Sequence, residues 1–195
     1  MTGPFWTEGA ALLCRFGGET LRIEPWGPDA VRVRARPGLG VVEPPVSALR
    51  PPPPVEAAAE IGTGRATLTV GRLCVEMSVK ERYGADVKRE VVVRYVRSDT
   101  GEELLAEARP HFAGPRARSF KALASGSWRL EATFRAREGE SFWGLGQPQH
   151  GRMDLKGVTT TLLQQNAHVA IPFAVSSCGY GLLWNNPAAG RVELA

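Results

Sequence analysis

The sequence predicts an all-β protein, a sandwich of about a dozen antiparallel strands, and three observations point to that class. Apolar and polar residues alternate in short segments such as 20–24 and 30–34, which is the two-residue period of a half-buried strand. Turn sequences separate these segments at the spacing typical of a sandwich. No convincing amphipathic helix is present, and the one helix-like piece, residues 55–61, is short.

The alternation predicts further strands along the whole chain. In segment 30–34 we expect Val31 and Val33 to share one face and the arginines the other. Ser98 to Gly101 is expected to be a hairpin turn, with glycine supplying a positive φ. The other expected strands are residues 65–70, 72–79, 90–97, 104–106, 129–135, 158–163, 169–176, 179–184 and 190–194.

Two stretches between the strands are expected to be irregular. The prolines at positions 44, 45 and 51–54 exclude a helix or a central strand. We interpret this stretch as a long surface loop rather than a ligand of an SH3-type module. Residues 109–127 are interpreted as a second loose region.

Composition and charge limit the classes of function. The chain has 195 residues, 43% of them hydrophobic and 23% charged, which suits one globular domain with a sizeable core. A net charge of +4 without basic clusters argues against nucleic acid as a partner. The N-terminus lacks the features of a signal peptide or a membrane span, so we expect a cytoplasmic protein that does not bind membranes.

Three cysteines at wide spacings, Cys14, Cys74 and Cys178, favour free buried thiols over disulfides or a zinc site. The three histidines also show no metal-ligand spacing. We therefore expect neither a metal nor another cofactor.

The C-terminal third carries the most information about function. FWGLGQ (142–147) combines two aromatic residues with two glycines, and a polar loop, QHGRMDLKG (149–157), follows it. Next come LLQQNAHVAIPF (162–173) and VSSCGYGLLWNNP (175–187). Because the sequence stops at Ala195 in the middle of a strand pattern, we expect a piece of a longer protein.

These four segments, in this order, resemble the N-terminal domain of family 31 of the glycoside hydrolases, which contains α-glucosidases and α-xylosidases. The Gly-Leu-Gly-Gln at 144–147 is similar to the α-xylosidase-like branch. The resemblance is specific over residues 142–184 and rests only on strands and turns over residues 21–137. It implies that residues 1–195 form a single galactose-mutarotase-like β-sandwich (supersandwich) domain of a larger glycosidase, whose catalytic TIM barrel is absent from this chain.

The resemblance also implies that catalysis lies elsewhere. In the family, two aspartates on the barrel act as nucleophile and acid/base in a retaining mechanism, which needs two carboxyl groups about 5 Å apart. This chain has four aspartates, Asp29, Asp86, Asp99 and Asp154, and it lacks the Trp-x-Asp followed by Asn-Glu of the nucleophile motif. We therefore expect no catalytic residue here and no glycosidase activity from the chain alone.

The family's sandwich lends one loop to the sugar site of the barrel, and that loop corresponds here to residues 165–168. The resemblance assigns substrate binding to Asn166 and its neighbours Gln165 and His168, where His168 stands at the position of an acidic residue. His150, in the preceding polar loop, is a further candidate sugar ligand. Both histidines could equally be ordinary surface residues. The implied partners are the downstream barrel and an α-linked saccharide, and the oligomeric state stays open.

Other residues admit a functional and a structural interpretation. Trp143 and Trp184 could stack on sugar, but strand positions favour core packing. Asp154 and Lys156 are interpreted as a solvated ion pair, and Ser176 as structural because no nucleophile elbow surrounds it.

Three alternatives to the accessory-domain hypothesis remain open. The first is a free-standing carbohydrate-binding module that uses Trp143, Gln149 and Trp184. The second is a mutarotase-like epimerase, which would need a histidine and a glutamate facing a sugar pocket, with His111 as the candidate histidine. The third is a purely structural interaction domain.

Overall fold

The computed structural model describes residues 3–41, 49–82, 88–108 and 116–194. These residues form sixteen strands, all of whose pairings are antiparallel, and the described segments contain no helix. The predicted all-β class is thus confirmed, with more strands than the expected dozen. No helix in the described part of the chain is long and apolar enough to cross a membrane.

The chain divides into two compact units, which we describe separately. The N-terminal unit comprises Met1–Pro45 and Arg50–Arg135, and the C-terminal unit comprises Val46–Leu49 and Ala136–Ala195. The organisation of both as one domain of a longer protein stays a prediction.

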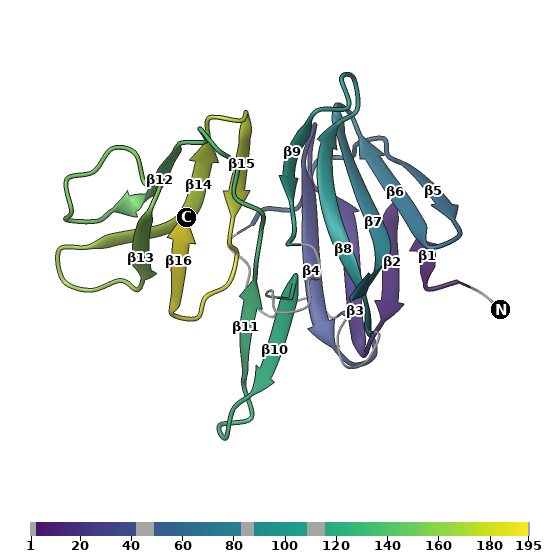
Figure 1. The fold of residues 1–195 in the computed structure, drawn as a ribbon, viewed down its shortest axis with the longest axis horizontal. Coiled ribbons are helices and arrows are strands. Elements are labelled where there is room, and N and C mark those ends of the chain that lie inside the picture. The colour runs from purple at the N-terminus through teal and green to yellow at the C-terminus, as the bar shows by residue number, and fades with distance from the viewer. Residues whose placement is uncertain (1–2, 42–48, 83–87, 109–115, 195) are drawn as a thin grey trace. The chain divides into compact units, whose positions relative to one another are not determined.

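The N-terminal unit contains two sheets that share one apolar core (Figure 1). Leu12, Leu21 and Ile23 of the first sheet and Leu68, Val75, Met77 and Val93 of the second are fully buried there. A two-stranded hairpin completes the unit. The first sheet is β1 (Phe5–Glu8), β2 (Ala11–Phe16), β3 (Glu19–Pro25) and β4 (Val31–Pro37); the second is β5 (Ala58–Gly62), β6 (Arg65–Val70), β7 (Leu73–Arg82), β8 (Lys88–Arg97) and β9 (Glu103–Ala106); the hairpin is β10 (Arg118–Ala122) and β11 (Trp128–Ala132).

The alternation along β4 is confirmed, because Val31 and Val33 pack against this core. The arginines of the strand lie on the other face. Arg34 Nη2 donates to Glu24 Oε1 at 2.8 Å, and the Arg32 guanidinium group lies over the Trp26 ring at 4.5 Å. The basic residues of this sheet are therefore neutralised or stacked locally, in keeping with their even spread along the sequence.

A buried ion cluster joins the β10–β11 hairpin to both sheets. The Arg118 guanidinium group donates to Glu19 Oε1 at 2.6 Å, to the Val91 carbonyl oxygen at 2.7 Å, and to Glu107. Glu107 Oε2 also accepts the Val93 amide at 2.7 Å. Burial raises the pKa of the Glu107 carboxyl group, although Arg118 opposes this shift. The cluster fixes the start of β10 in a segment that the sequence predicts to be loose.

Several sequence predictions for this unit are wrong at the level of single elements. Residues 55–61, which have only a short helix-like pattern, contain most of the unpredicted edge strand β5 (Ala58–Gly62), which pairs with β6. Strands β1, β2 and β10 are not predicted, and β11 ends at Ala132 rather than at residue 135. The prediction of buried thiols is right for Cys14 and wrong for Cys74 and Cys178, which are free but only partly buried. Burial raises the pKa of the Cys14 thiol to about 12.

The C-terminal unit consists of a three-stranded and a two-stranded sheet around a smaller core. Leu145, Leu155, Leu162 and Ala174 are buried in this core, with Trp184 packed against them. The three-stranded sheet has the order β12 (Phe142–Gln147), β14 (Val169–Ser176), β15 (Tyr180–Leu183), and the other pairs β13 (Val158–Leu162) with β16 (Gly190–Leu194).

The FWGLGQ segment forms β12 and contains a bulge. The register with β14 shifts between Gly144 and Gly146, and Gly144, Leu145 and Gly146 all have positive φ angles, of 107°, 59° and 92°. Only glycine adopts such angles readily. The bulge turns the Leu145 side chain, 3% exposed, into the core, which explains why two glycines flank a leucine here.

Candidate functional site

The pairing of β12 with β14 brings the two polar loops of the C-terminal unit to the same end of one sheet. Gln147, the last residue of β12, lies opposite Val169, the first residue of β14. The loop of residues 148–157 leaves the sheet at Gln147, and the loop of residues 163–168 enters it at Val169. The candidate residues His150, Gln165, Asn166 and His168 all belong to these two loops and are all exposed.

Gln165 to His168 form a tight turn with Asn166 near its tip. The His168 amide donates to the Gln165 carbonyl oxygen at 2.8 Å, and the two residues form an isolated bridge. Asn166 has a φ of 47°, a left-handed conformation that asparagine tolerates better than most residues. The turn therefore presents the Asn166 amide group to solvent on a defined backbone.

The side chain of Gln164 holds this turn in place from the side. Its Nε2 donates to the His168 carbonyl oxygen, and its Oε1 accepts the Ala170 amide at 3.1 Å. One side chain thus satisfies a donor and an acceptor of the backbone beyond the turn. The sequence analysis missed Gln164, whose only signal was its place in the polar segment before Asn166.

His150 makes its hydrogen bond within its own loop. Its Nδ1 accepts the Arg152 amide at 3.1 Å, so that Nε2 carries the proton of the neutral ring. Asp154 organises the end of the same loop by accepting the Lys156 amide at 2.9 Å and the Phe142 amide at 3.1 Å. The expected ion pair between Asp154 and Lys156 is wrong, because Lys156 Nζ donates to the Arg137 carbonyl oxygen at 3.2 Å.

An apolar face extends along the sheet from the Asn166 turn. Val169, Ile171, Phe173 and Val175 alternate along β14 with exposures of 40% to 50%. Trp143 of β12 lies opposite Val175, and Leu183 of β15 opposite Phe173, so both belong to the same face. We call these six side chains, Trp143, Val169, Ile171, Phe173, Val175 and Leu183, the apolar face; each is at least 40% exposed.

Core packing, which is predicted for both Trp143 and Trp184, is confirmed only for Trp184. Trp184 packs against the core of the unit, whereas Trp143 is 40% exposed on the apolar face.

Ser176 is structural as predicted, since its hydroxyl group donates to the buried Glu140 carboxylate and accepts the Cys178 amide at 3.0 Å. Tyr180 donates to the same carboxylate at 2.7 Å, and burial together with Glu140 raises the pKa of Tyr180.

The described aspartates serve local structure. Asp29 binds the Arg72 amide at 2.6 Å and its guanidinium group at 3.0 Å, Asp99 binds Arg97 at 2.8 Å, and Asp154 orders its loop. Asp86 and His111 lie outside the described residues. Within the described segments, no group of three or more His, Cys, Asp or Glu side chains could hold a metal ion.

Comparison with curated proteins finds relatives over nearly the whole chain, although no protein-family model matches it. The chain is 34% identical over 194 residues to an uncharacterized family 31 glucosidase, ORF2, of Pseudescherichia vulneris, covering 95% of this chain and 36% of the relative. It is 27% identical over 212 residues to alpha-xylosidase A of Aspergillus niger, covering 97% of this chain and 27% of the relative.

Among solved structures, a similar fold occurs in the crystal structure of a GH31 alpha-xylosidase from a soil metagenome in complex with xylose. The TM-score is 0.82 at 28% sequence identity, over 98% of this chain and 29% of that one. The chain thus spans about a third of the length of these relatives, and it matches their N-terminal β-sandwich region.

Proposed function

Because the chain corresponds to the N-terminal β-sandwich region of glycoside hydrolase family 31 and matches its α-xylosidases over most of its length, we propose that it is the accessory domain of a retaining α-glycosidase of α-xylosidase or α-glucosidase type. In this proposal the apolar face packs against the catalytic barrel of the longer protein. The Gln165–His168 turn then reaches the sugar site.

The observation that carries the proposal is the continuity of the apolar face with the Asn166 turn. Six apolar side chains at 40% to 50% exposure form one face of a three-stranded sheet, and its first residue, Val169, directly follows His168. Exposed apolar area of this kind marks an interaction surface. If another domain covers the apolar face, the Gln165–His168 turn lies at the rim of that interface. From there the turn can reach a ligand bound to the other domain.

The chemistry of the turn supports a sugar contact. The Asn166 side chain offers two N–H donors and a carbonyl acceptor, which match the mixed donor and acceptor character of sugar hydroxyl groups. The ring nitrogens of His168 and Nε2 of His150 add further hydrogen-bonding partners beside it. Asn166 is held in a left-handed conformation, and Gln164 anchors the following backbone, so the amide loses little further freedom when it binds.

In this proposal the chain itself does not cleave a glycosidic bond. A retaining mechanism needs two carboxyl groups about 5 Å apart that are free to act as nucleophile and acid/base. The three described aspartates instead bind arginines or backbone amides in exposed turns. We place both catalytic groups on the longer protein's barrel.

The experiment that tests the sugar contact replaces Asn166 with glycine in the longer protein. Asn166→Gly removes the amide group but keeps a residue that adopts a φ of 47° easily. The proposal expects kcat/KM for an aryl α-xyloside to fall about tenfold or more, as for loss of a hydrogen bond of about 1.5 kcal/mol.

The matched control is Gly9→Asn, which places an asparagine at a left-handed position of the turn between β1 and β2 in the N-terminal unit, where a Cβ meets nothing within 4 Å. This control is expected to leave kcat/KM within about twofold of the parent enzyme. An Asn166→Gly enzyme with unchanged kcat/KM would remove the turn from the sugar site.

A further inference from the structure

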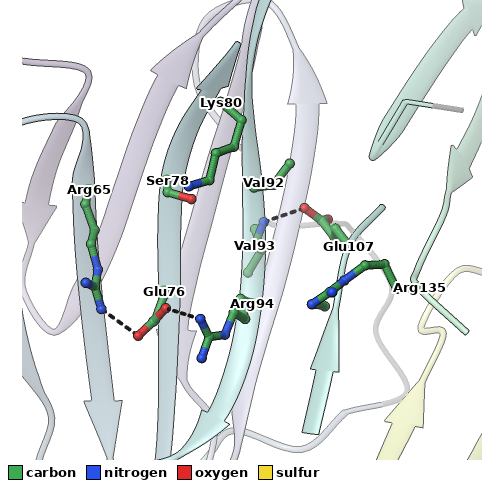
Figure 2. A pocket seen from close by; sticks show the side chains of 10 residues that line it. Arg65, Glu76, Ser78, Lys80, Val92, Val93, Arg94, Glu107 and Arg135 are labelled. Atoms are coloured by element: carbon green, nitrogen blue, oxygen red, sulfur yellow. Dashed lines mark hydrogen bonds and ion pairs between the residues drawn. The ribbon is translucent and has the colours of Figure 1, made fainter. Parts of the chain in front are cut away.

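The N-terminal unit carries a pocket of about 150 Å³ on the outer face of its second sheet. Strand alternation places Ser78 and Lys80 of β7 and Arg94 of β8 on this face, and Glu107 and Arg135 close the pocket beyond β9. Figure 2 shows these side chains gathered around one shallow hollow. The described residues that line the pocket all belong to the N-terminal unit, and the proposed function does not use them.

Glu107 gives the pocket an unused acceptor. Its Oε2 atom accepts both the Val93 amide and Arg118, while no hydrogen bond reaches its Oε1 atom from the described residues. The side chain is only 4% exposed, yet it lines the pocket, so this oxygen is accessible from the pocket. A carboxylate oxygen in such a place favours a ligand that donates a hydrogen bond.

Lys80 gives the pocket an unused donor. It is exposed, and in the described part of the structure its ammonium group has no hydrogen-bond or ion-pair partner. The ammonium group ends beside Ser78 (Figure 2), whose hydroxyl group both donates and accepts. The pocket thus offers donors and acceptors within one small volume.

Two arginines that line the pocket, Arg94 and Arg135, already contact carboxylates that partly neutralise their charge. Arg94 and Arg135 both contact Glu103, Arg94 at 3.1 Å, and Glu76 receives Arg65 at 2.6 Å and Arg94 at 3.6 Å. The Nε atom of Arg135 is buried and has no hydrogen-bond acceptor. The lining arginines therefore keep N–H groups available to a ligand without a strong excess of positive charge.

This lining selects the chemical class of the ligand. The described lining holds four cations, Arg65, Lys80, Arg94 and Arg135, and two carboxylates, Glu76 and Glu107. An oxyanion would therefore meet like charge on two sides, and an apolar ligand would find Val92, Val93 and Ala106 among charged groups. A neutral ligand with adjacent hydroxyl groups can donate to Glu107 and accept from Lys80 and the arginines at once, because each hydroxyl group is both donor and acceptor.

We propose that this pocket binds a neutral, hydroxyl-rich ligand, a single monosaccharide unit, as a second carbohydrate site. None of the described residues that line the pocket is aromatic, so this lining offers no ring for the stacking that strengthens many sugar sites. The site therefore binds weakly, in the millimolar range, and holds one sugar unit.

The test is a titration of the protein with D-xylose, followed through the backbone amide signals in two-dimensional NMR. The proposal expects saturable shifts at Ser78, Arg94 and Glu107. Lys80→Met removes an ammonium group that makes no hydrogen bond or ion pair with the described residues, and is expected to weaken xylose binding about tenfold. Lys121→Met, on the exposed β10–β11 hairpin outside the pocket, is the matched control and is expected to change nothing.

Three results would overturn the proposal: no saturable shift at the pocket amides, equal weakening in both lysine variants, or the same shifts produced by inorganic phosphate at lower concentration than by xylose. The last would identify an anion site. The first includes shifts confined to residues 165–168, which would contradict this site while supporting the sugar contact at Asn166. Shifts confined to the pocket would leave Asn166 to be judged by its own experiment.

Discussion

Gln147 lies opposite Val169 in the pairing of β12 with β14, and this one contact organises the C-terminal unit. It brings the loop of His150 and the turn of Asn166 to one end of the sheet. It also starts the apolar face at the residue that follows the turn. His150 and His168, which are 18 positions apart in the sequence, therefore lie in loops at the same end of one sheet.

The bulge in β12 depends on Gly146. A Cβ atom there would overlap the Val169 carbonyl oxygen, and the φ angle of 92° disfavours any side chain. Gly146→Ala is expected to lower the free energy of unfolding by more than about 2 kcal/mol, as measured by urea denaturation. The control Gly151→Ala, with a φ of 67° but nothing within 4 Å of its Cβ, is expected to cost about 1 kcal/mol. Equal costs would contradict the overlap.

Strand alternation predicted the fold well wherever one face of a strand is buried and the other is exposed to solvent. β4 and β6 follow this pattern, with Val33 and Leu68 turned inward. β2 could not be found this way, because Ala11 to Cys14 are all buried and no alternation is left to read. In residues 55–61 the pairing of β5 with β6 overrides the helical preference of three alanines.

The buried pair of Arg118 and Glu107 is expected to make the N-terminal unit sensitive to the loss of either partner. Their side chains are 5% and 4% exposed, so Arg118→Met leaves a buried carboxylate without its partner. Such a loss is expected to lower the free energy of unfolding by about 3–5 kcal/mol.

The double variant Arg118→Met/Glu107→Gln is expected to recover part of this loss, because the unpaired charge is gone. The control Arg97→Met breaks the exposed pair with Asp99 and is expected to leave the urea midpoint unchanged. A double variant as unstable as Arg118→Met would contradict the cost assigned to the unpaired charge.

Asp154 is expected to make the stability of the C-terminal unit depend on pH. The Lys156 amide, the Ser141 side chain and the Phe142 amide lower the pKa of Asp154 in the folded protein. Its stabilisation is therefore present above the ordinary pKa of aspartate, about 3.9, and is lost as the pH falls through the lowered pKa. Asp154→Ala should lower the urea midpoint at pH 7, and the difference from the parent protein should shrink below about pH 3.

The apolar face is expected to make the isolated chain self-associate. Ile171→Ser introduces a hydroxyl group at the middle of the face. It is expected to reduce the weight-average molar mass measured by light scattering after gel filtration. Ile61→Ser is the matched control, because Ile61 is 49% exposed, against 50% for Ile171, but lies on β5 of the N-terminal unit. Similar effects of both variants would mean that the face has no special role.

The candidate site could be predicted only in part. The polar segment around Asn166 and the loop of His150 stood out in the sequence, and both are exposed loops at one end of a sheet. The role of Gln164 depends on two backbone contacts beyond the turn, which no sequence pattern specifies. The exposure of Trp143 was missed because a bulge and a strand pairing, rather than its own neighbours, decide which face it occupies.

The central claim is that this chain supports a glycosidase whose catalytic groups lie elsewhere in a longer protein. The most direct measurement compares hydrolysis of an aryl α-xyloside by this chain with hydrolysis by the product of the whole reading frame. The account predicts no turnover above the blank for the chain and turnover with retained anomeric configuration for the whole product. Turnover by the chain alone, or a reading frame that stops directly after Ala195, would contradict it.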